Sequence, residues 1–113
     1  MQIKRLPEFE KEFKKLWKKY PSLEEDFSVF ESVLIINPRD NIPISGSWEN
    51  KKGEFYKVKK FRCQSIARQS VNSGIRIIYN YVESEELIEL TYIEIYHKNR
   101  PDKNHNIDRI KAF

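Results

Sequence analysis

The residues of this chain that point to chemistry are basic side chains near the ends of predicted strands: Lys57, Lys59, Arg76 and Lys98. Alternation along residues 55–61 places Lys57 and Lys59 on one side of a strand, while Arg76 opens the next strand and Lys98 follows the last. Cations that converge from separate strands would bind RNA phosphates and stabilise a pentacoordinate phosphorane, which carries extra negative charge. A lysine crowded by cations has a lowered pKa, which suits a general base for a 2′-hydroxyl.

The distribution of charge agrees with a polyanionic partner. The 113 residues include 21 Lys or Arg and 17 Asp or Glu, which gives a net charge of +4. Residues 1–56 carry ten of each sign, so the excess lies in residues 57–113, with eleven bases and seven acids. Segment 57–76 holds six bases and no acid. Such clusters favour a phosphate-rich ligand, and the alternative is a solvated basic face.

Most catalytic templates are absent from the sequence. Three glycines and no phosphate-binding loop exclude a dinucleotide fingerprint. A single cysteine, Cys63, excludes an intramolecular disulfide and, with two histidines, leaves a zinc site short of ligands. We therefore expect a structural Cys63, no metal and no cofactor. No apolar run approaches the roughly 18 residues that cross a bilayer, and no signal-peptide core is present, which predicts a cytoplasmic protein without membrane contact.

The elements that must position these side chains form one predicted α+β domain over residues 1–113. In order, they are a strand at 1–6, helices at 8–20 and 22–36, a loop at 37–54, strands at 55–61, 75–82 and 87–96, and a short helix at 107–113. Ser22 and Glu25 predict a capping box at the second helix. We expect an antiparallel helical hairpin on one face of a three-stranded antiparallel sheet, with the first strand able to pair parallel with a later one.

Three motifs carry a family resemblance: Tyr56-Lys57-Val58-Lys59, Ser73-Gly74-Ile75-Arg76-Ile77-Ile78-Tyr79 and Ile93-Glu94-Ile95-Tyr96-His97-Lys98. Together with the order strand, helix, helix and three strands, they resemble the RelE/ParE superfamily of type II toxins over essentially the whole chain. The resemblance implies a small cytoplasmic toxin, neutralised by a cognate antitoxin and needing no small-molecule cofactor. RelE-type members cut mRNA in the ribosomal A site without a metal, whereas ParE-type members inhibit gyrase.

The resemblance also implies roles for individual residues. Lys57 and Lys59 match paired lysines that bind RNA and act in base catalysis. Arg76 matches the arginine that stabilises the scissile phosphate, and Lys98 falls where a second basic residue aids the transition state or leaving group. The family's C-terminal tyrosine, which stacks on the substrate base, has no counterpart here, and His105 is the candidate replacement.

Further basic residues extend the predicted RNA-binding surface: Lys60, Arg62, Arg68 and Arg100. Residues 62–72 form a longer segment than in compact family members, and it is either part of that surface or a polar loop. Trp48, in the predicted long loop, is either a lid over the core or part of a partner site. The strand tyrosines are expected in the half-buried core rather than as base-stacking platforms: Tyr79, Tyr81, Tyr92 and Tyr96.

Three functions remain open on the sequence. The first is a RelE-like endoribonuclease acting on ribosome-bound mRNA. The second is a ParE-like gyrase inhibitor with no catalysis of its own, which would explain the missing tyrosine. The third is a degenerate, inactive toxin fold that binds nucleic acid or protein. The four strand-borne cations favour the first.

Overall fold

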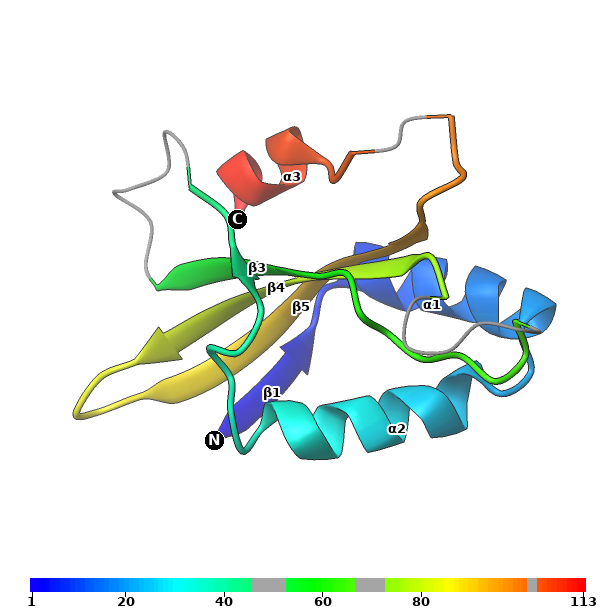
Figure 1. The fold of residues 1–113 in the computed structure, drawn as a ribbon. Coiled ribbons are helices and arrows are strands. Elements are labelled where there is room, and N and C mark those ends of the chain that lie inside the picture. Colours follow the sequence, from blue (N-terminus) through cyan, green and yellow to red (C-terminus); the bar gives the residue numbers. More distant parts are fainter. Residues whose placement is uncertain (46–52, 67–72, 102–103) are drawn as a thin grey trace.

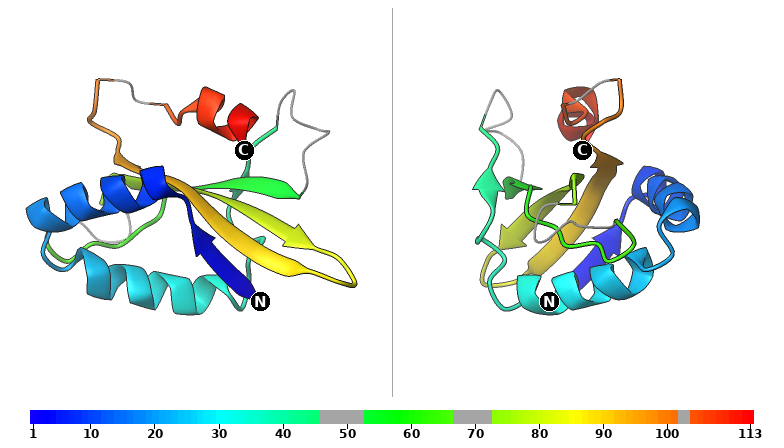
Figure 2. Two further views of the ribbon diagram at one scale, coloured as in Figure 1. Left: turned by 180° about the vertical axis from the view of Figure 1, so that it is seen from behind. Right: turned by 45° about the vertical axis from the view of Figure 1, so that its right-hand side comes forward.

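The computed structural model of the protein describes residues 1–45, 53–66, 73–101 and 104–113. Its elements are β1 (Gln2–Arg5), α1 (Pro7–Lys19), α2 (Leu23–Leu34), β2 (Ile42–Pro43), β3 (Glu54–Val58), β4 (Ile75–Glu83), β5 (Ile88–His97) and α3 (Ile107–Ala112). Helices α1 and α2 lie on one side of the sheet and run in opposite directions, and α3 lies on the other side (Figure 1, Figure 2). The α+β class predicted from the sequence is confirmed.

The sheet has five strands in the order β1-β5-β4-β3-β2, so the predicted three-stranded antiparallel sheet is wrong. Strands β3, β4 and β5 pair antiparallel as expected. β1 adds a parallel edge, with Ile3 opposite Leu90. β2, inside the predicted loop, adds an antiparallel edge with Ile42 opposite Lys57. A proline is tolerated in β2 because an edge strand leaves one side of its backbone unpaired.

The hairpin of α1 and α2 covers the larger hydrophobic core. The ring centres of Phe9 on α1 and Tyr92 on β5 lie 5.2 Å apart, and those of Phe13 on α1 and Phe27 on α2 lie 5.3 Å apart. Aromatic pairs at these separations fill a small core with few residues. The predicted capping box is wrong, because Ser22 Oγ donates to the Asp26 carboxylate at 2.6 Å and makes no capping bond. No helix in the described ranges is long and apolar enough to cross a membrane.

The opposite face carries a smaller cluster under α3. Its buried members come from three strands and the helix: Phe55, Ile78, Ile93, Tyr96 and Ile110. Arg109 of α3 reaches past the sheet to α1, where its two terminal nitrogens donate to the Glu12 carboxylate at 2.8 and 3.0 Å. This bidentate ion pair fastens the C-terminal helix to the body of the fold.

A β-bulge in β5 decides which side chains point toward α3. Tyr79 lies opposite Tyr92, yet its neighbour Ile78 lies opposite Glu94, so Ile93 is an extra residue. Ile93 and Glu94 therefore both face α3, and Tyr96 falls on that face as well. Strict alternation from Tyr92 would have turned Tyr96 toward the hairpin instead. The bulge thus brings an aromatic ring to the face that carries the basic side chains.

Candidate active site

Lys57 stands on the α3 face of β3, in a row with Ile78 of β4 and Glu94 of β5. Its ammonium group lies 5.9 Å from the centre of the Tyr96 ring. The side chain is partly buried, whereas that of Lys59 is exposed. Lys57 is therefore held against an aromatic wall, as a positioned catalytic group would be.

The surroundings of Lys57 shift its protonation equilibrium toward the neutral amine, compared with a lysine in water. Burial lowers the pKa of Lys57, and the charges of Lys59, Arg76 and Arg100 lower it further, while Glu94 opposes them. A neutral lysine amine can accept a proton, which a fully charged ammonium cannot. We call Lys57, Lys59, Arg76 and Arg100 the basic cluster.

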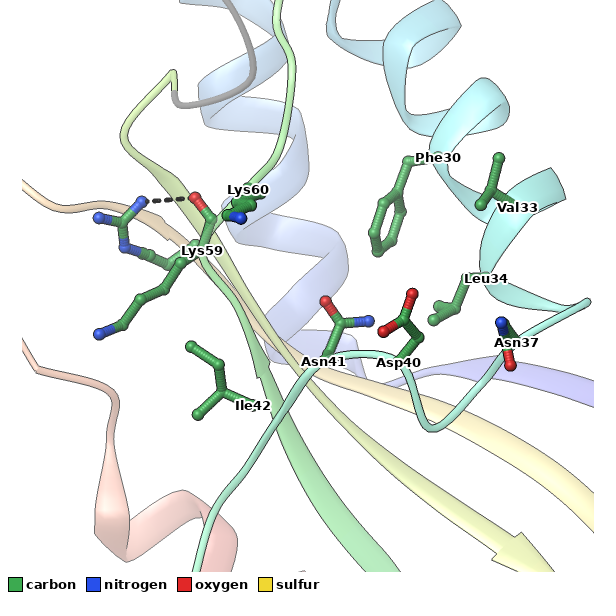
Figure 3. Close-up of a pocket in the computed structure, with 10 residues that line it drawn as sticks. Phe30, Val33, Leu34, Asn37, Asp40, Asn41, Ile42, Lys59 and Lys60 are labelled. Atoms are coloured by element: carbon green, nitrogen blue, oxygen red, sulfur yellow. Dashed lines mark hydrogen bonds between the residues drawn. The ribbon is translucent and has the colours of Figure 1, made fainter.

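Arg76 connects Lys59 to the rest of this cluster. In the sheet register Arg76 lies opposite Tyr96, and its Nη1 donates to the backbone carbonyl of Lys59 at 3.0 Å. Lys59 follows the last residue of β3, so its side chain is free of the strand pairing that fixes Lys57. This hydrogen bond, the dashed line beside Lys59 in Figure 3, joins two of the sequence-predicted catalytic residues at the end of β3.

Arg100 and Glu94 form an ion pair beneath the C-terminal segment. Arg100 Nη1 donates to the Glu94 carboxylate at 2.9 Å, and the Asn106 backbone N–H donates to the same carboxylate at 2.8 Å. Arg100 also donates to the carbonyl of Asn104. Glu94 is only 2% exposed, so its charge depends on these partners. Arg100, predicted to bind RNA, is instead engaged with the chain while remaining beside Lys57.

Lys98 lies at the end of the sheet, beside Gly74. Its backbone N–H donates to the Gly74 carbonyl at 2.8 Å. The neighbouring His97 stacks on Tyr20 of the hairpin, with ring centres 6.3 Å apart. Burial lowers the pKa of His97, and the charges of Lys19, Lys98 and Arg76 lower it further, while a hydrogen bond from the imidazole to the Ser73 backbone carbonyl raises it. In the register of the sheet, Arg76 on β4 lies two residues after the Gly74 that Lys98 contacts, and Ile78, opposite Lys57, lies two residues further.

The remaining predicted site residues lie at different distances from the cluster. His105 is partly buried in the segment that Asn104 and Asn106 tie to Arg100 and Glu94. Lys60 is exposed and follows Lys59. Arg62 is exposed on a segment whose neighbours Phe61 and Cys63 pack into the core beneath the hairpin. Arg68 and Trp48 lie outside the described residues.

A cavity of about 680 Å³ opens beside the end of β3. Its apolar walls come from α2 and β2. Its polar lining comes from the loop between them, from the residues after β3 and from β4. The lining residues are Phe30, Val33, Leu34, Asn37, Asp40, Asn41, Ile42, Lys59, Lys60 and Arg76. Figure 3 shows the Phe30 ring and the Asp40 and Asn41 side chains entering the same space from opposite sides. We call it the α2–β3 cavity. Lys59 and Arg76 belong to both the basic cluster and the cavity.

Sequence reasoning missed the residues that complete this site. Tyr96 was expected in the core, and it is buried, but on the face that carries Lys57. Glu94 was not singled out, because nothing in the sequence marks the bulge that points it toward Arg100. Asp40 was not singled out either, because it falls in the predicted loop. The neighbouring Asn37-Pro38 indicated only that a helix ends there. A charged residue between two strand isoleucines was the one available signal for Glu94.

The described ranges contain no group of three or more His, Cys, Asp or Glu side chains that could hold a metal ion. Cys63 is buried, and burial raises the pKa of its thiol, which agrees with a structural rather than a nucleophilic role. No protein-family model matches the chain, and no curated protein matches it either.

Proposed function

We propose that the protein is a ribosome-dependent endoribonuclease that cleaves mRNA in the cytoplasm, as the toxin of a type II toxin–antitoxin pair with a cognate antitoxin. The observation that carries the proposal is the partly buried Lys57 amine, whose pKa is lowered by burial and by Lys59, Arg76 and Arg100. Neighbouring cations repel one another, so the basic cluster is suited to bind a negatively charged phosphate. The same repulsion makes Lys57 better able to accept a proton.

In the proposed reaction, Lys57 acts as the general base. Its neutral Nζ takes the proton of a ribose 2′-hydroxyl, and the 2′-oxygen forms a bond to the adjacent phosphorus. The bond from phosphorus to the 5′-oxygen of the next nucleotide breaks. We assign the proton that the leaving 5′-oxygen receives to the Lys98 ammonium. The products are a 2′,3′-cyclic phosphate and a 5′-hydroxyl end.

Arg76 and Lys59 stabilise the phosphorane in this scheme. The phosphorane carries one more negative charge on its non-bridging oxygens than the ground-state diester, so fixed cations lower its energy more than that of the substrate. The sheet register holds the backbone of Arg76, and its hydrogen bond to the Lys59 carbonyl orients the guanidinium. Every step uses groups of the protein itself.

A second function is favoured by a different observation. Arg100 donates to Glu94 and to the Asn104 carbonyl, and Arg76 donates to the Lys59 carbonyl, so the chain itself engages two members of the basic cluster. Cations engaged in this way suit a binding module better than a catalyst. A degenerate toxin fold that binds RNA or protein without cleaving it, or a ParE-like gyrase inhibitor, would need no general base.

The test is a cleavage assay on 5′-labelled mRNA, with purified ribosomes, in the presence and absence of the protein. We expect cuts that depend on ribosomes and 2′,3′-cyclic phosphate ends by mass spectrometry. Lys57→Ala and Arg76→Ala should each lower the cleavage rate at least about a hundredfold. Lys111→Ala, which removes an exposed lysine on α3, serves as the control and should cleave normally.

Each alternative has its own outcome in parallel assays. RNA binding without any cleavage would support the binding module. Inhibition of gyrase supercoiling, with mRNA left intact, would support the gyrase inhibitor. Cleavage that survives Lys57→Ala unchanged would overturn the assignment of the general base.

A further inference from the structure

The α2–β3 cavity has a rigid aromatic and aliphatic wall. The Phe30 ring packs against Phe27 and Phe61, with ring centres 5.8 and 5.4 Å apart, so its position is fixed by the core. Val33 and Ile42 continue the wall and are 63% and 46% exposed, so apolar surface faces the cavity entrance. A flat apolar ring system would find contact on both sides of this space.

The polar side of the cavity is a loop held in one conformation. Tyr79 Oη, on a fully buried side chain, donates to the Pro38 carbonyl at 2.6 Å and accepts from Asn41 Nδ2 at 3.1 Å. Arg39 anchors the same loop to Glu54 on β3 through a hydrogen bond of 2.9 Å. These bonds hold the loop on both sides of Asp40, whose carboxylate points into the cavity in Figure 3.

The cavity is charged differently at its two ends. Lys59 and Lys60 lie at one end, where Arg76 donates to the Lys59 carbonyl, and Asp40 and Asn37 lie toward the other (Figure 3). A ligand that fits must carry an anion on one side and hydrogen-bond donors on the other, with a flat apolar body between them. A nucleotide has this arrangement, with its phosphate at one end and its base edge at the other.

We propose that the α2–β3 cavity binds a guanine nucleotide of the RNA, with the base against Phe30, its Watson–Crick edge on Asp40 and its phosphate on Lys59 and Arg76. The inference rests on the proposed function, because it takes RNA as the ligand of those two cations. It adds to that function a base-specific site outside the basic cluster, and it assigns specificity to Asp40.

Guanine is favoured over the other bases by the chemistry of a carboxylate. Ionised Asp40 only accepts hydrogen bonds, and it can accept two parallel ones. Guanine presents two adjacent donors, N1–H and the 2-amino group, on one edge. Adenine presents one donor beside an acceptor nitrogen, which would face the carboxylate without a hydrogen bond. A bidentate contact of this kind gives discrimination on the order of tenfold or more.

The experiment is an NMR titration of the full chain with 3′-GMP, 3′-AMP and 3′-IMP in turn. We expect 3′-GMP to bind about tenfold more tightly than 3′-AMP. Inosine lacks the 2-amino group, so 3′-IMP should fall between them. Asp40→Asn should reduce the preference for 3′-GMP to less than about twofold, since the second acceptor is lost. Asp108→Asn removes the same charge from an exposed position on α3 and should keep the full preference.

Equal affinities for 3′-GMP and 3′-AMP, or no binding of either, would overturn the inference. So would an Asp40→Asn protein that keeps the full preference for guanine. These results are independent of catalysis, because no bond is cleaved in the titration. Guanine-selective binding in a protein that fails the mRNA assay would overturn the proposed endoribonuclease alone, and non-selective binding in an active nuclease would overturn the guanine site alone.

Discussion

The guanidinium of Arg100 lies over the Tyr96 ring, 3.8 Å from its centre. The same group donates to the buried Glu94 carboxylate at 2.9 Å. Arg100 therefore covers one face of the Tyr96 ring and is also the counter-ion of Glu94, which has little access to water. Both contacts hold the segment after β5 against the sheet, next to Lys57.

Removing Arg100 should destabilise the fold through the acid it leaves behind. We expect Arg100→Ala to lower the free energy of unfolding by about 2–4 kcal/mol, because Glu94 would remain buried without its ion-pair partner. Urea denaturation measures the loss. In the Glu94→Gln/Arg100→Ala protein the cost should be at least about 1 kcal/mol smaller, since no charge is then stranded. Equal costs in the two proteins would show that the ion pair is not what Arg100 contributes.

The lowered pKa of Lys57 predicts how cleavage responds to pH. The rate should rise with pH until the pH passes the pKa of Lys57, because only the neutral amine accepts the 2′-hydroxyl proton. Lys57→Arg keeps the positive charge but cannot lose its proton in this range, so it should be inactive at every pH. Single-turnover rates across a pH series measure both effects. A Lys57→Arg protein that retains the wild-type rate would show that the residue only binds phosphate.

The lowered pKa of Lys57 also predicts how the stability of the protein changes with pH. A lysine whose folded pKa is below its unfolded pKa binds protons more weakly in the folded state. Stability should therefore increase as the pH rises from the folded to the unfolded pKa of Lys57, and Lys57→Met should remove this increase. Urea midpoints measured over that pH range provide the check.

Gly74 is a position where any side chain should be costly. Its φ is +89°, and an added Cβ would lie 2.8 Å from Nε2 of His97. We expect Gly74→Ala to destabilise the protein by about 2–3 kcal/mol, from the left-handed backbone and the crowding together. In a His97→Ala background the cost should fall to about 1–2 kcal/mol, since only the backbone penalty remains. An unchanged cost would place the whole effect in the backbone.

Lys98 should matter more for the chemical step than for binding. If its ammonium protonates the leaving 5′-oxygen, Lys98→Ala should lower the single-turnover cleavage rate about a hundredfold and RNA affinity only a few-fold. Lys111→Ala is again the matched control. Equal losses of rate and affinity would show that Lys98 only anchors the RNA.

The helices and the three long strands could be predicted because their apolar periodicity is continuous. Phe9 and Phe13 mark one helical stripe, and both are buried where the stripe predicts. β2 could not be predicted, since a two-residue strand containing Pro43 has no period of its own and exists only because β3 offers an edge. The capping box failed for a related reason: Ser22 also accepts from the backbone of Ser65, far along the chain.

For the basic side chains, the sequence allows a prediction within one strand only. Alternation is a local property, and it predicts that Lys57 and Lys59 lie on one side of their strand. That Lys57 and Arg76 share a face follows from the register between β3, β4 and β5. The bulge at Ile93 is set by the pairing between strands, and no glycine or proline marks it in the sequence. The sequence therefore did not show on which face of the sheet the side chains of Tyr96 and Glu94 lie. The position of Asp40 depends on a hydrogen bond from Tyr79 that only the folded chain makes.

The parallel pairing of β1 with β5 sets Gln2 opposite Glu89 and Arg5 opposite Tyr92. During synthesis, β1 must wait until residues 89–92 of β5 have been made before its backbone finds this partner, and closing so long a stretch of chain is slow. Tyr96 and Arg100, which enclose Lys57, are made later still. A nascent copy therefore has no assembled basic cluster until the residues through Arg100 have been made.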